Sequence, residues 1–213
     1  MRRSIVLTLS LCAGLAGSAS AATLNANPGP ANNGLSSGNP GLLFDLSATT
    51  NLMVTHLQTA ASAAAGGAFS FEVYTRVGSA LGGPVGAGPG SSLSGWTLVG
   101  IANGTQGATS GGVSLQIDIP DINVIAGQTT GVALRWISGG GPRYFGTGSP
   151  PLENYSDGTL TLITGDARSA VFTTGGTWFS SRALVGSLTY EIPTPGAASL
   201  LAIAGLTGIR RRR

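Results

Sequence analysis

The chain has 213 residues, of which 42% are hydrophobic and only 9% are charged, and it contains 35 glycines. This composition excludes an intrinsically disordered chain, and the glycines lack the three-residue period of collagen. All eleven basic residues are arginines. Six lie at the two ends, and five arginines minus eight acids leave a net charge of −3 between them. We therefore expect no basic surface for nucleic acid and no nucleic-acid partner.

The first 22 residues have the organisation of a secretory signal peptide. They contain a positively charged start, an apolar run and small residues before a cleavage site, namely Arg2 and Arg3, residues 5–16, and residues 19–21. We expect export through the general secretion machinery, with signal peptidase cutting after Ala21 or Ala22. The only cysteine, Cys12, lies in this segment, so cleavage would leave a body without thiols or disulfides.

Residues 23–192 form the predicted body, in which we find no convincing helical period. Short alternating or β-branched runs are separated by clusters of Gly, Pro, Asn and Ser, which is typical of strands joined by turns. Nine runs qualify: 42–46, 52–57, 68–75, 96–102, 113–119, 129–137, 159–164, 169–173 and 183–192. The Ala-rich stretch 59–65 is a candidate for one helical turn. The pattern predicts an all-β, antiparallel sandwich of jelly-roll or Greek-key type.

No group of residues in the body predicts catalysis. His56 is the only histidine, and no Gly-x-Ser-x-Gly turn accompanies it, so we interpret it as a surface or edge-strand residue rather than a triad base or metal ligand. Acids near turns could hold Ca²⁺, the one cofactor left open, or act as a glycosidase pair. These acids are Asp118, Asp121, Glu153, Asp157 and Asp166. Their positions favour capping of turns and strand ends instead.

Three aromatic residues near glycine-rich segments are candidate carbohydrate contacts: Trp96, Tyr144 and Trp178. A flat ring can cover the apolar face of a sugar, so a sugar-binding module should expose at least two of these rings on one face. The competing interpretation is that the rings pack in the core or cover the ends of sheets. Trp136, within an apolar run, is predicted to be a core residue.

The last 21 residues combine a proline motif, an apolar stretch and an arginine cluster. They are Pro193, Thr194, Pro195 and Gly196, then residues 197–209, then Arg210, Arg211, Arg212 and Arg213. This tail resembles the PEP-CTERM sorting signal of Gram-negative bacteria, with threonine in place of the usual central glutamate. The resemblance implies a membrane helix, with the arginines on the cytoplasmic side, and recognition by an exosortase, a transpeptidase-like membrane enzyme. It also implies cleavage near residues 193–196 and release.

The sequence thus predicts a signal peptide at 1–22, a β-sandwich body at 23–192 and a sorting tail at 193–213. We expect an exported protein that is first anchored in the inner membrane and then reaches the cell surface or the extracellular matrix. Its body is expected to be non-enzymatic and structural or adhesive, with a polysaccharide or matrix component as partner. A carbohydrate-binding module is the alternative, and a secreted glycoside-active enzyme is the third hypothesis.

Overall fold

The computed structural model describes residues 20–26, 28–36, 38–146 and 153–193. The predicted signal helix and membrane helix lie outside these residues. Apart from Pro193, the described residues belong to one compact unit, Ser20–Ile192, which is built from antiparallel sheets. Within the described ranges, the only helical element is a short 3₁₀ turn, Pro89–Ser91. No helix in these ranges is long and apolar enough to cross a bilayer. The all-β fold predicted from the sequence is confirmed.

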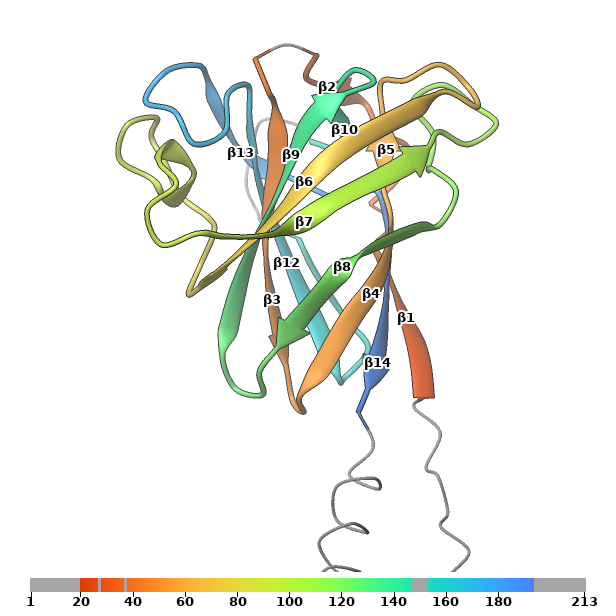
Figure 1. The fold of residues 1–213 in the computed structure, drawn as a ribbon, viewed down its shortest axis with the longest axis vertical. Coiled ribbons are helices and arrows are strands. Elements are labelled where there is room, and N and C mark those ends of the chain that lie inside the picture. The colour runs from red at the N-terminus through yellow and green to blue at the C-terminus, as the bar shows by residue number, and fades with distance from the viewer. Residues whose placement is uncertain (1–19, 27, 37, 147–152, 194–213) are drawn as a thin grey trace, which may run out of the picture. The chain divides into compact units, whose positions relative to one another are not determined.

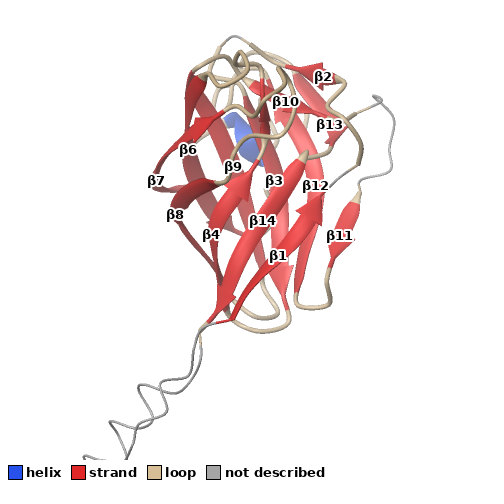
Figure 2. Ribbon diagram, turned by 90° about the vertical axis from the view of Figure 1, so that its right-hand side faces the viewer, coloured by secondary structure: helices blue, strands red, loops and turns tan. Residues whose placement is uncertain are grey.

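Two sheets carry most of the structure (Figures 1 and 2). The small sheet has the order β1 (Ser20–Ala26), β14 (Gly186–Ile192), β4 (Leu52–Gln58) and β8 (Ile117–Val124). The large sheet has the order β11 (Asn154–Ser156), β12 (Leu160–Arg168), β3 (Gly41–Ala48), β9 (Thr129–Ser138), β6 (Ala68–Val77) and β7 (Thr97–Thr105), and β13 (Trp178–Arg182) pairs with β12. A third, short sheet contains β2 (Asn33–Gly34), β10 (Pro142–Tyr144) and β5 (Ala60–Ala61).

The main core contains the inward-facing side chains of both large sheets. Strand β6 shows the predicted alternation, because Phe69, Phe71 and Val73 are buried while the residues between them are only half-buried. Tyr74, which follows Val73, is buried on the opposite face. Trp136 of β9 is buried against Phe71, with ring centroids 5.1 Å apart, which confirms it as a core residue. Burial of each such side chain contributes roughly 1.5–3 kcal/mol to stability.

Two local predictions are wrong. The run 169–173 is not a strand: β12 ends at Arg168, and the chain turns. Phe172 has a φ of 62°, outside the β region, and its amide donates to Gly90 O (2.7 Å) instead of to a neighbouring strand. The Ala-rich stretch 59–65 is not helical either, because Ala60 and Ala61 are fully buried in β5, where methyl groups fit a crowded position.

The outer face of the large sheet carries a second, smaller core. Leu43, Tyr74 and Ala133 lie on this face, one each from β3, β6 and β9. Two loops cover them. We call these the β6–β7 loop (residues 78–96) and the β12–β13 loop (residues 169–177). Because strands buried on both faces lose the simple alternation, this second core explains why β3 is buried along nearly its whole length.

Candidate functional site

Two buried carboxylates hold the β6–β7 loop against the large sheet. Asp45 of β3 accepts hydrogen bonds from Ser79 Oγ and from the Ala80 amide, both at 2.6 Å. Asp166 of β12 accepts one from the Gly82 amide at 2.7 Å. Both aspartates are at most 4% exposed. Their oxygens therefore accept the hydrogen bonds that these loop groups would otherwise make with water.

A buried arginine completes this attachment. Arg168, at the end of β12, is 1% exposed and donates to Gly82 O (2.9 Å) and Ser91 Oγ (3.1 Å). The loop lies so close that a Cβ at Gly90 would come within 2.7 Å of Arg168 Cδ and 2.8 Å of Leu43 Cδ2. The glycines of this loop thus allow close packing on a charged, buried side chain.

The environment shifts the pKa of each of these buried groups. Burial raises the pKa of Asp45 and of Asp166, and the hydrogen bonds they accept act in the opposite direction. The Trp178 indole N–H also lowers the pKa of Asp166, although its geometry is not that of a regular hydrogen bond. Burial lowers the pKa of Arg168, and the nearby Asp166 opposes that change. Because hydrogen bonds from the loop engage both carboxylates, we assign this cluster a structural role.

The tryptophans proposed as sugar contacts both pack on the same loop. Trp96 Nε1 donates to Pro89 O (2.9 Å), and the Trp178 ring lies where a Cβ at Gly83 would overlap it. Both side chains are half-buried. Tyr144 is only 3% exposed and lies under the Arg182 guanidinium, 5.7 Å from its ring centroid. Because Tyr144 is buried, it is removed from the candidate contacts, whereas Trp96 and Trp178 are each only partly exposed.

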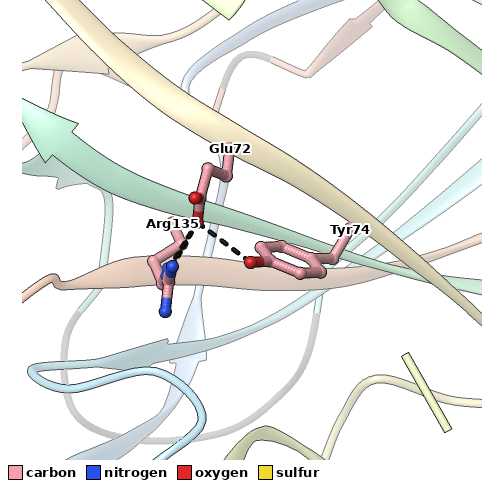
Figure 3. A network of polar contacts seen from close by, with 3 residues as sticks. All are labelled: Glu72, Tyr74 and Arg135. Atoms are coloured by element: carbon pink, nitrogen blue, oxygen red, sulfur yellow. Dashed lines mark hydrogen bonds and ion pairs between the residues drawn. The ribbon is translucent and has the colours of Figure 1, made fainter. Parts of the chain in front are cut away.

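A charged and aromatic network lies beside the loop on the outer face of the large sheet (Figure 3). Glu72 of β6 and Arg135 of β9 are register partners. Arg135 Nε donates to Glu72 Oε2 at 2.6 Å, and its Nη2 lies 2.5 Å from the same oxygen. Tyr74 OH donates to that oxygen at 3.0 Å. Burial raises the pKa of Tyr74, and this hydrogen bond raises it further.

Phe172 of the β12–β13 loop joins this network to Trp96. Its ring centroid is 4.7 Å from that of Tyr74 and 5.2 Å from that of Trp96. The Arg135 guanidinium lies 6.0 Å above the Phe172 ring. A positive φ at a bulky residue costs of order 1–3 kcal/mol. The contacts of its ring with Tyr74, Trp96 and Arg135 hold Phe172 in this backbone conformation.

Arg76 also packs on Trp96, and it lines an open cavity of about 410 Å³. Its guanidinium carbon is 5.4 Å from the Trp96 ring centroid. We call this space the Arg76 cavity. The polar side chains that line it include Thr75, Arg76, Thr97, Asn123, Gln128 and Thr129. It is formed where the end of β6 meets the beginnings of β7 and β9 and the end of β8.

The other residues singled out from the sequence are dispersed. His56 is half-buried on β4, with Nδ1 2.9 Å from Thr55 Oγ1, and Asp118 is its register partner on β8. Asp157 caps the turn between β11 and β12 through the Thr159 and Leu160 amides. Among the described residues, no three His, Cys, Asp or Glu side chains gather as they would around a metal.

Most of the predicted sorting tail lies outside the described residues. Pro193 is described and is exposed, directly after β14. Thr194, Pro195 and Gly196 lie outside the described ranges, as do the four arginines at 210–213.

Reasoning from the sequence did not single out Glu72, Arg76, Arg135 or Phe172. One signal was present: Glu72, Tyr74 and Arg76 alternate with apolar or small residues, so they share one face of a strand. In a half-buried strand, such a polar face is expected to point to solvent. The contribution of Phe172 depends on a loop that folds back over the sheet, which no local pattern indicates.

Comparisons with known proteins give this chain no family. No protein-family model matches it, and no curated protein matches its sequence. The functional interpretation therefore rests on the residues and geometry described above.

Proposed function

We propose that this chain is an exported protein. Its C-terminal tail anchors the precursor in the inner membrane, and an exosortase-type enzyme then delivers the protein to the cell surface or matrix. The tripartite sequences at both ends support this. The fold adds one observation, which carries the proposal. Strand β1 pairs with β14, and Ser20 is the register partner of Ile192. The body therefore begins and ends at one place, which suits a domain that is tethered at a single point.

The position of strand β1 is compatible with removal of a signal peptide. Cleavage after Ala21 would leave Ala22 as the first residue and would remove only the outermost register pairs of the strand. Leu24 and Ala26, the fully buried residues of β1, would stay in the core. The hydrophobic contacts of β1 would thus be kept in the mature protein.

The interleaved strand order supports the jelly-roll or Greek-key type expected from the sequence. Strand β3 lies between β12 and β9, and β14 lies between β1 and β4. All neighbours in the small sheet, and several in the large sheet, thus come from distant parts of the chain. A simple meander would instead place consecutive strands side by side.

For the body we propose a structural or adhesive role. Buried carboxylates fix its β6–β7 loop, and the half-buried rings of Trp96 and Phe172 pack together beside the outer face of the large sheet. Carbohydrate binding is the second candidate, and it is favoured by Arg76, which lines an open cavity and packs against the Trp96 ring. The Asp45 and Asp166 carboxylates hold the β6–β7 loop, so they do not favour a glycoside-active enzyme.

Cell fractionation tests the sorting proposal. The wild-type protein is expected at the surface or in the medium. A variant in which Arg210, Arg211, Arg212 and Arg213 are replaced by serine should lose its membrane stop and accumulate as soluble periplasmic protein. Thr194→Glu restores the usual motif and is the matched control, which should behave as the wild type does. Surface delivery of the serine variant at the wild-type level would contradict the proposal.

A further inference from the structure

The guanidinium of Arg76 lacks the acidic partner that its neighbour Arg135 has. Among the described residues, Arg135 is ion-paired with Glu72, whereas no ion pair is formed by Arg76. Arg76 Nε is buried without a hydrogen-bond partner. Asp45 attracts Arg76 electrostatically, but the hydrogen bonds that Asp45 accepts come from Ser79 and Ala80. Arg76 thus carries a positive charge that no ion pair neutralises within the described part of the chain.

Aromatic packing fixes Arg76 in position. The guanidinium lies against Trp96, with 5.4 Å between its central carbon and the ring centroid. The indole is held by its hydrogen bond to Pro89 O and by contact with Phe172. A cation held in this way loses little side-chain entropy when it binds an anion, which favours affinity.

The cavity beside Arg76 is lined by neutral polar groups. Thr97, Asn123 and Gln128 provide hydroxyl and amide groups, which can both donate and accept hydrogen bonds. Val77 and Ile125, 83% and 45% exposed, add apolar surface to the same lining. The volume of about 410 Å³ lies within the range of small-ligand sites. No acidic side chain is among the lining residues.

We propose that the Arg76 cavity binds an acidic sugar unit of a polysaccharide, such as a uronate. The carboxylate would pair with Arg76, since a planar guanidinium suits a carboxylate. The sugar hydroxyls would bond to the threonine and amide side chains, and the C–H face of the ring would rest on Val77 and Ile125. This inference deepens the proposed adhesive function by naming the class of partner.

Calorimetric titration of the full-length protein in detergent tests the inference. The probes are trigalacturonic acid, a neutral galactose trisaccharide of equal length, and a glutamate-rich peptide of equal charge. The acidic sugar should bind at least about tenfold more tightly than the neutral one, since one charge-assisted pair is lost with the latter. Its affinity should also fall as salt rises. Equal affinity for the acidic and the neutral sugar would overturn the proposal. If the peptide bound as tightly as the acidic sugar, the assignment of the ligand as a sugar would be overturned.

Two arginine variants localise the site. Arg76→Gln should weaken binding of the acidic sugar by about tenfold or more. Arg143→Gln is the matched control, because Arg143 lies on β10, away from the cavity lining, and should bind as the wild type does. Unchanged affinity in Arg76→Gln would overturn the site.

A further comparison covers the case in which Arg76→Gln does not fold. Gln128→Ala alters an exposed residue of the lining and should still weaken binding several-fold, so unchanged affinity there would again count against the site.

The test of sugar binding can be separated from the test of sorting. Loss of sugar binding with normal delivery to the surface overturns only the cavity, and normal sugar binding with failed delivery overturns only the sorting.

Discussion

Glycine at residue 90 shows how strongly single positions constrain this fold. Gly90 has no space for a side chain, because Arg168 and Leu43 occupy the position of a Cβ. Both neighbours are about 1% exposed, so neither can move into solvent. A composition rich in glycine indicates loops when the sequence is read alone. The structure shows that this glycine serves close packing instead.

A pair of glycine variants tests this explanation. Gly90→Ala should destabilise the protein by about 1–3 kcal/mol through overpacking. Gly175→Ala is the control, because nothing lies within 4 Å of its would-be Cβ, and its effect should stay within about 0.5 kcal/mol. Denaturant unfolding of the two variants measures the difference. Equal stability of both variants would show that the β6–β7 loop is not packed as described.

At the scale of elements, Asp166 and Asp157 fix two different connections between strands. Their contributions to the free energy of unfolding should change in opposite directions with pH. Burial raises the pKa of Asp166. For Asp157, burial also acts upward, but the Leu160 and Thr159 amides and the Tyr190 hydroxyl outweigh it, so its pKa is lowered. The stabilisation linked to Asp166 is therefore full below the usual aspartate pKa of 3.8 and is lost as pH rises through the raised value. The stabilisation linked to Asp157 is present above 3.8 and is lost as pH falls through the lowered value.

Asparagine variants separate these two effects. Relative to wild type, Asp157→Asn should cost most at neutral pH and progressively less as the pH falls below 3.8. For Asp166→Asn the loss of stability should be greatest in acid and should shrink as the pH rises above 3.8. Urea unfolding measured across the acid range checks both slopes. Parallel pH profiles of the two variants would contradict the assignment.

The elements also show how far the sequence alone could predict the structure. Strands such as β6 and β9 were predictable because their own residues alternate or are continuously apolar. Strands β2, β5 and β10 are two or three residues long and exist through pairing with distant segments. The residues of the candidate site likewise differ in how far the sequence predicts them. Trp96 was singled out by its type, whereas Arg76 and Phe172 gain their surroundings only when two loops fold over the large sheet.

At the scale of the whole molecule, the pairing of β1 with β14 connects the fold to the proposed export. Ser20 and Ile192 meet in register at the two limits of the body. Cleavage of the signal peptide and of the sorting tail would therefore take place near the same end of the paired strands β1 and β14. Because β1 keeps Leu24 and Ala26 in the core, the mature body should stay folded once the predicted signals are removed.

Intact-mass and terminal-peptide mass spectrometry of the native, surface-released protein tests the central claim most directly. The account predicts a mature N-terminus at Ala22 or Thr23 and a C-terminus between residues 193 and 196. Both ends follow from the same sorting route, so they should be found on the same molecules. Released protein that still ends at Arg213, or that still begins at Met1, would contradict it.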